Sequence, residues 1–184
     1  MVVNEAIEIL NAPRPNYTKR NYHGVIFYKW KSSTGDMLVS FTPKQVLPNE
    51  YPIIGASLEY RKMLSTDNKG LIYYYEVRFG KKELNTEIEG YELTKTGNPT
   101  EILIGVLGAT ERFQKEHRDF NYLQYIAIGR GRVKAYNLLT KLMAKKNNLP
   151  YYIDGENENY ANYFVFFTDK THTKPYITDT RSTF

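Results

Sequence analysis

Hydrophobic and polar residues follow two different patterns along this chain, and the changes between them mark its elements. Residues 25–30 and 37–41 are strand-like runs, and the polar segment KSSTGD between them predicts a β-hairpin. Residues 101–117 and 131–146 place apolar residues at spacings of three and four, which indicates helices with one buried face. Residues 120–128, between these helices, are apolar enough for a central strand.

A short helix and several further strands complete the predicted order. Residues 2–10 have Val3, Ile7 and Leu10 on one side of a helix, which the two prolines of NAPRPNY then end. The segments GLIYYYEVRFG and EGYELTKTG predict a second hairpin, since the first is rich in aromatic and β-branched residues. The segments YYID and NYFVFFTD predict two final strands.

The order hairpin, hairpin, helix, strand, helix, strand, strand predicts an α/β (α+β) fold. We expect a mixed, mainly antiparallel sheet with the two main helices packed on one face. The helix face of Val106 and Phe113 and the helix face of Val133 and Leu139 then lie on the same side of that sheet.

The first main helix carries two features that set expectations for its packing. Thr100 can cap a helix that begins at Glu101, whose carboxylate suits the first turn. Gly105 and Gly108 each cost about 1 kcal/mol relative to alanine inside a helix. We therefore expect these glycines to permit close packing against the sheet.

The length of 184 residues is enough for one domain with a full core. We expect a single domain over residues 1–184, with an N-terminal hairpin region and irregular connection over 1–57. An α/β core with a polar C-terminal tail then covers 58–184. No apolar run approaches the roughly 18 to 20 residues that cross a bilayer, and the first residues carry acids where a signal peptide carries cations. The prediction is a soluble, non-secreted protein that does not enter a membrane.

Several kinds of catalytic site are excluded or disfavoured by the residues present. The chain has no cysteine, which excludes disulfides, thiolate metal sites and a cysteine nucleophile. His23, His117 and His172 lack metal-ligand spacing, so no metal is expected. The segment HRD lacks the other residues of a kinase catalytic loop, and no glycine–serine elbow supports a serine triad. The sequence therefore leans toward a non-enzymatic protein.

Positive charge gathers after the central strand, in a chain whose formal net charge is +5. The turn there offers free N–H groups at a helix N-terminus, two glycines that allow close approach, and two arginines that can grip phosphate oxygens. Lysines then follow at helical spacing and extend a basic stripe. The candidate anion- or partner-binding residues are Gly129, Arg130, Gly131, Arg132, Lys134, Lys141 and Lys145.

Two interpretations of these charges stay open. In the first, the helix face is solvated and the arginines pair with acids such as Asp154 or Glu156. In the second, the charges contact nucleic acid or an acidic protein partner. The consecutive tyrosines Tyr73, Tyr74 and Tyr75 offer a further surface on which bases could stack, against the alternative that these rings pack or form an interface.

The strand, turn and helix from Tyr122 to Tyr152 resemble the coenzyme-A-binding segment of the GNAT acyltransferase superfamily. That signature is Gln or Arg, two residues, Gly, any residue, then Gly or Ala. With Arg130 at its first position, Val133 stands where glycine belongs and Ala135 ends the motif. The resemblance implies a divergent or inactive acyltransferase whose cofactor would be coenzyme A. Apart from this resemblance, no cofactor is expected.

A looser resemblance, from Tyr73 to Tyr152, is to small phage proteins of unassigned activity. It rests on two patterns, V-x-x-A-x-x-x-F at residues 106–113 and R-x-x-x-Y-x-x-L at residues 132–139. A Lys-, Asn-, Tyr- and Ile-rich composition fits the AT-rich genome of a phage or low-GC host. We expect a phage-encoded binding protein that acts in the host cytoplasm or virion. The sequence is compatible with an oligomer. The alternatives are a GNAT-like acyltransferase and a virion structural protein such as a connector or cargo protein.

Overall fold

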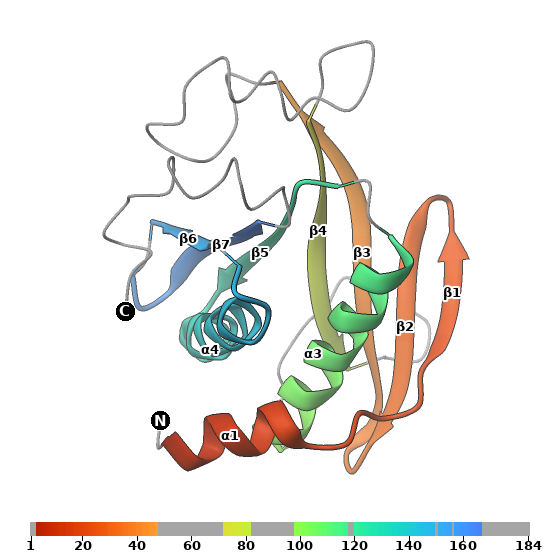
Figure 1. The fold of residues 1–184 in the computed structure, drawn as a ribbon, viewed down its shortest axis with the longest axis vertical. Helices are drawn as coiled ribbons and strands as arrows, with labels where there is room; N and C mark the ends of the chain where they lie inside the picture. Colours follow the sequence, from red (N-terminus) through yellow and green to blue (C-terminus); the bar gives the residue numbers. More distant parts are fainter. Residues whose placement is uncertain are drawn as a thin grey trace. The chain divides into compact units, whose positions relative to one another are not determined.

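The computed structural model describes residues 3–47, 72–81, 98–117, 120–149, 151–155 and 157–166 (Figure 1). Its elements, labelled as in Figure 1, are α1 (Val3–Asn11), β1 (Thr18–Tyr22), β2 (Val25–Ser32), β3 (Gly35–Val46), β4 (Ile72–Lys81), α3 (Pro99–Glu116), β5 (Tyr122–Ile128), α4 (Arg130–Asn147), β6 (Tyr151–Asp154) and β7 (Tyr160–Phe166). No helix among the described residues is both long enough and apolar enough to cross a membrane.

The strands form one seven-stranded sheet in the order β1-β2-β3-β4-β5-β7-β6. The sheet is mixed and mainly antiparallel, since β1 with β2, β2 with β3, β5 with β7 and β6 with β7 all pair antiparallel. The predicted α+β class is therefore confirmed. The predicted partner of β4 in a second hairpin, EGYELTKTG, lies outside the described residues.

The chain divides into two compact units, and each is described by itself. The first unit contains Met1–Thr42 and Val77–Glu116, and the second contains Pro43–Glu76 and His117–Phe184. Helices α1 and α3 belong to the first unit, and α4 belongs to the second. Whether α3 and α4 share one face of the sheet stays a prediction, because the two helices belong to different units.

The core of the first unit forms between α3 and the β2–β3 hairpin. Alternate β2 residues Ile26, Tyr28 and Trp30 are buried, as a strand with one covered face requires. The ring of Phe113 on α3 stacks on Phe41 of β3, with ring centroids 4.0 Å apart and planes 2° apart. Both rings are fully buried, so they anchor α3 to the hairpin.

The two glycines of α3 pack closely, Gly105 against the sheet as predicted and Gly108 against Tyr17, which precedes β1. A Cβ added at Gly105 would lie 2.3 Å from the indole of Trp30, which belongs to β2. A Cβ added at Gly108 would lie 2.3 Å from the hydroxyl of Tyr17, and that hydroxyl donates a hydrogen bond of 2.7 Å to the Gly105 carbonyl. The absence of a side chain at both positions lets Tyr17 and the Trp30 indole of β2 approach the helix backbone.

The predicted start of α3 was wrong by two residues. Asn98 caps the helix, because its side-chain oxygen accepts hydrogen bonds from the N–H groups of Thr100 at 3.1 Å and Glu101 at 3.4 Å. Pro99 then occupies the first helical position, where a missing N–H costs nothing. The Thr100 hydroxyl instead lies 3.4 Å from the Glu5 carboxylate.

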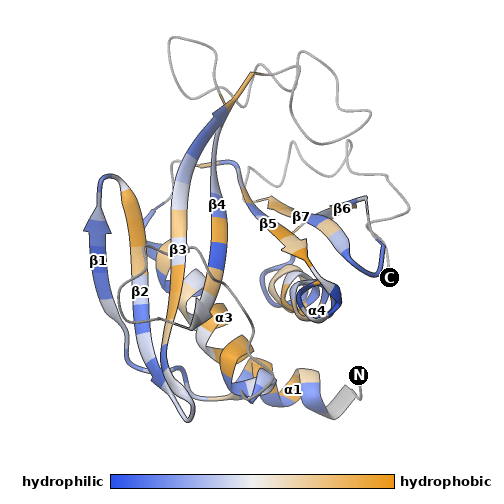
Figure 2. Ribbon diagram, turned by 180° about the vertical axis from the view of Figure 1, so that it is seen from behind, coloured by the Kyte–Doolittle hydropathy of each residue, from blue (hydrophilic) through white to orange (hydrophobic). Residues whose placement is uncertain are grey.

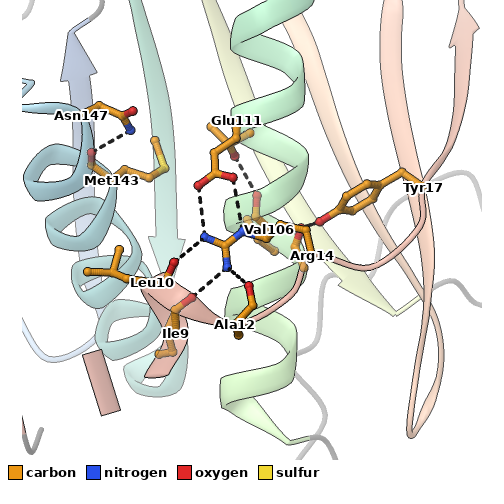
Figure 3. Close-up of polar contacts among 11 residues, drawn as sticks. Ile9, Leu10, Ala12, Arg14, Tyr17, Val106, Glu111, Met143 and Asn147 are labelled. Carbon is orange, nitrogen blue, oxygen red and sulfur yellow. Dashed lines mark hydrogen bonds and ion pairs between the residues drawn. The ribbon is translucent and has the colours of Figure 1, made fainter. Parts of the chain in front are cut away.

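Helix α1 forms where predicted. Its Ile9 is fully buried, whereas Ile7, on the predicted apolar side, is 51% exposed. Arg14 fixes the end of this helix: its guanidinium donates to the carbonyls of Ile9, Leu10 and Ala12 and to both carboxylate oxygens of Glu111 on α3 (Figure 3). The cation satisfies the free carbonyls of the last turn and ties α1 to α3.

The sequence patterns missed β1, because all five of its residues are exposed and polar or aromatic; Figure 2 shows it as mostly hydrophilic. Its Lys19 forms an ion pair with Glu116 at the end of α3. The Glu116 carboxylate also accepts hydrogen bonds from Arg112 and from the Tyr28 hydroxyl, both at 2.9 Å. Partial burial opposes ionisation of Glu116, but these three donors prevail and lower its pKa to about 2.

In the second unit, α4 packs on β5 and β7 through tyrosines. The Tyr163 hydroxyl on β7 donates to the Val133 carbonyl at 3.0 Å, and the Tyr125 hydroxyl on β5 lies 3.3 Å from the Met143 sulfur. The ring of Tyr136 makes edge contacts with both tyrosines. The predicted inner face of α4 is confirmed, since its members are all buried: Val133, Tyr136, Leu139, Leu142 and Met143.

Candidate functional site

The turn between β5 and α4 is built on Gly129. Its φ of 98° lies in the region that favours glycine. The Gly129 N–H donates to the Asn159 carbonyl at 2.7 Å, and the Gly129 carbonyl accepts from the Val133 N–H at 3.0 Å. Gly129 is also the N-cap of α4 and provides no side-chain cap. The first N–H groups of the helix, at Arg130, Gly131 and Arg132, therefore have no partner within the helix.

The predicted basic residues fall on two sides of α4. Arg130, Lys134, Lys141 and Lys145 are separated by four, seven and four residues, so they line one side of the helix. Arg132 lies two residues from Arg130, or about 200° around the helix axis. It is half-buried and does not belong to the same row. We call the row of Arg130, Lys134, Lys141 and Lys145 the basic stripe; it extends over about 22 Å.

All the charged residues of α4 are positive. Its 18 residues include six cations and no acid, whereas the whole chain has a net charge of only +5. Because the helix contains no acid, its cations cannot form i,i+4 ion pairs within the helix. Pairs such as Lys141 and Lys145 instead repel each other by a few tenths of a kcal/mol.

Three members of the stripe are exposed and have no ion-pair partner among the described residues. Arg130, Lys134 and Lys145 are exposed, and no described carboxylate forms an ion pair with them. Lys141 is half-buried and has other contacts. Asp154, a predicted partner for the arginines, instead lies 3.5 Å from the Tyr152 hydroxyl. The other predicted partner, Glu156, lies outside the described residues.

Helix stability does not explain the charges at the start of α4. Arg130 and Arg132 lie in the first turn, where the helix dipole favours anions and each cation costs about 0.3–1 kcal/mol. Lys145 and Lys146 in the last turn are favourable by the same rule. The unfavourable end combines two guanidinium groups, N–H groups without a partner inside the helix, and open space at Gly131, where an added Cβ would meet nothing within 4 Å. This arrangement is suited to an anion.

A neighbouring apolar pair was not predicted from the sequence. Ile128 at the end of β5 is 66% exposed, and Tyr160, its directly opposed partner on β7, is 39% exposed. We call these two residues the Ile128–Tyr160 patch. The only sequence signal was that the apolar central strand ends at Ile128, next to the basic turn. An apolar residue at that position is equally typical of the core.

The other predicted surface, Tyr73 to Tyr75, is engaged in packing. Tyr74 stacks on Tyr122 with ring centroids 4.6 Å apart, and Tyr75 makes an edge contact with Phe120. The Tyr73 carbonyl accepts from the Asn121 N–H at 2.8 Å. All three tyrosines are half-buried, so this run is a weaker candidate for base stacking than the exposed Tyr160.

A pocket of about 440 Å³ in the first unit is a further candidate. Its lining includes Arg14, Trp30 and Glu101. However, Arg14 is already bound by Glu111, and the Glu101 carboxylate accepts from the Ser33 N–H at 2.7 Å and from the Ser33 hydroxyl at 2.5 Å. A polar ligand would have to displace these bonds. Within the described part of the chain, no group of three His, Asp or Glu side chains could hold a metal ion.

Comparisons with protein-family models, curated proteins and solved structures found no match for this chain. The resemblances to phage proteins and to the GNAT segment therefore stay predictions.

Proposed function

We propose that this chain is a non-enzymatic, phage-encoded binding protein that contacts a polyanionic partner through the basic stripe of α4. The observation that carries the proposal is the charge of this helix: six cations, no acid, and no described ion-pair partner for Arg130, Lys134 or Lys145. Such a charge distribution attracts nucleic acid or an acidic protein surface.

Single exposed ion pairs contribute only about 0–1 kcal/mol, so the stripe acts as a cluster. A row of four cations over about 22 Å matches a partner with regularly spaced negative charges rather than one anion. Binding of this kind releases counterions and weakens as salt rises. The N–H groups at the start of α4 add donors at one end of the row.

The test reverses two exposed stripe residues, Lys134→Glu together with Lys145→Glu, and measures binding to heparin as a generic polyanion by fluorescence anisotropy from low to physiological salt. We expect wild-type binding that weakens with salt, and a loss of at least about tenfold in the variant, since each reversal replaces attraction with repulsion.

The matched control is Lys31→Glu together with Lys44→Glu. These lysines are also exposed, they lie on strands β2 and β3, and their reversal changes the net charge by the same amount. If both double variants lose affinity equally, binding depends on net charge and not on the stripe. If the wild type fails to bind heparin at low salt, the proposal is wrong.

A further inference from the structure

The Ile128–Tyr160 patch lies on the sheet face opposite to α4. Tyr125 and Tyr163 contact α4, and Ile128 and Tyr160 lie three residues away along β5 and β7. Successive side chains alternate between the two faces of a strand, so an offset of three reverses the face. The patch and the basic stripe therefore occupy different faces, joined by the short Gly129–Arg130 turn.

The Tyr160 ring is held in place from two sides. The Asn162 side chain donates a hydrogen bond of 2.6 Å to the Tyr160 hydroxyl. A Cβ added at Gly155 would lie 3.3 Å from the ring, so the ring packs over the backbone of that glycine. The Asn157 side chain accepts from the Tyr160 N–H at 2.9 Å and fixes the backbone that carries the ring. An exposed aromatic ring held in this way loses little freedom when another ring stacks on it.

The first cation of the basic stripe follows the patch closely along the chain. Ile128 is paired with Tyr160 and is only two residues from Arg130, the first member of the basic stripe. The open space at Gly129 and Gly131, where an added Cβ would meet no atom within 4 Å, allows a ligand backbone to approach the turn. A stacking platform next to phosphate-binding groups is the combination that proteins use for single-stranded nucleic acid.

We propose that the polyanion bound by this protein is single-stranded nucleic acid, with one base stacked on the Ile128–Tyr160 patch and the adjoining phosphates at Arg130 and along the basic stripe. This inference rests on the proposed function and specifies its partner. In a duplex both faces of an internal base are covered by its neighbours, so a duplex can use the stripe but not the patch. An acidic protein likewise uses the cations without needing the ring.

The experiment compares four labelled probes by fluorescence anisotropy: oligo(dT) and oligo(rU) of about 20 nucleotides, the corresponding DNA duplex, and a poly-glutamate peptide. We expect the wild type to prefer the single strands. Tyr160→Ala should weaken single-strand binding at least about fivefold, because stacking on an aromatic residue contributes about 1–3 kcal/mol per base. Binding of poly-glutamate should not change. The matched control is Tyr22→Ala, since Tyr22 is 62% exposed on β1 in the first unit.

Ile128→Asn is the second variant, because a side chain that is 66% exposed can be replaced without unfolding the strand, and a neutral polar group there should weaken the single strands selectively. Equal affinity for duplex and single strands, or no loss in either patch variant, would overturn this inference and leave the stripe proposal intact. Tight binding of poly-glutamate alone would also overturn this inference, and it would indicate that the partner of the stripe is an acidic protein. A wild type that binds none of the probes would overturn both proposals. The two single-strand arms show whether the protein prefers DNA or RNA.

Discussion

Adding one methyl group at Gly105 tests the packing of α3 on β2. The substitution Gly105→Ala should gain about 1 kcal/mol of helix propensity. Against this, the new Cβ would lie 2.3–2.5 Å from three atoms of the Trp30 indole. Contacts under 3.0 Å force a movement, and a rigid ring that is only 2% exposed has little room to move.

The net effect follows from these two contributions. Overpacking in a core costs about 1–3 kcal/mol and occasionally more. The Gly105 carbonyl also accepts the Tyr17 hydroxyl, and Tyr17 makes an edge contact with Trp30 at 5.9 Å, so a shift of the indole disturbs this hydrogen bond as well. We expect overpacking to outweigh propensity and to destabilise the protein by about 1–2 kcal/mol. That loss corresponds to a fall in Tm of about 2–8 °C for a chain of this size.

The assay is thermal and urea unfolding followed by circular dichroism. Gly131→Ala is the matched control, because Gly131 also lies in a helix but an added Cβ there meets no atom within 4 Å. It should leave Tm unchanged or raise it. The double variant Gly105→Ala/Trp30→Phe should be more stable than the sum of the single effects predicts, because a smaller ring relieves the clash. A rise in Tm for Gly105→Ala alone would refute the packing of α3 on Trp30.

Three further predictions concern other parts of the chain. Thr110→Val should destabilise by about 0.5–1.5 kcal/mol, because it removes a buried hydrogen bond to a helix carbonyl; Thr140→Val should be neutral or stabilising, because no described group bonds that buried hydroxyl. Equal effects in urea unfolding would contradict this difference. The pKa of Glu116 is lowered from 4.5 to about 2, so its contribution to stability is present above pH 4.5 and is lost as pH falls toward 2; Glu116→Gln should reduce the acid dependence of Tm in that window. Acetyl-coenzyme A should not bind tightly, because the N–H and carbonyl of Val133 are already bonded to Gly129 and Tyr163; low-micromolar affinity in calorimetry would instead support an acyltransferase.

The sequence predicted those elements whose burial repeats with a clear period. The inner face of α4 is an example: five apolar residues at helical spacing are all buried against tyrosines of the sheet. By contrast, β1 carries no such pattern, since its residues are all exposed and it is held by backbone pairing with β2 and by the Lys19–Glu116 ion pair. The start of α3 was misplaced because both Asn98 and Thr100 can act as caps. Pro99, a residue favoured directly after a cap, was the sequence signal for Asn98.

The sequence predicted which charged residues belong to the candidate site, but not how all of them are arranged. Residue spacing placed Lys134, Lys141 and Lys145 in one row, and the same spacing already puts Arg132 about 200° around the helix from Arg130. Only the packing of α4 shows that Arg132 is half-buried. The patch was missed for a related reason. Ile128 continues the apolar run of the central strand, and only the end of the sheet reveals that its side chain is exposed while Ala127, its neighbour, is buried.

Helix α4 can carry these charges because its stability comes from its inner side. The helix lacks a side-chain N-cap, has cations in its first turn and has like charges at i,i+4, and each of these features costs a few tenths to about 1 kcal/mol. Burial of Leu139 and Met143, each worth about 1.5–3 kcal/mol, together with the bond from Tyr163 to the Val133 carbonyl, outweighs that cost. Most helical stability in proteins comes from such tertiary packing. The outer residues therefore do not have to stabilise the helix, and the packing of its inner face holds the row of cations in place.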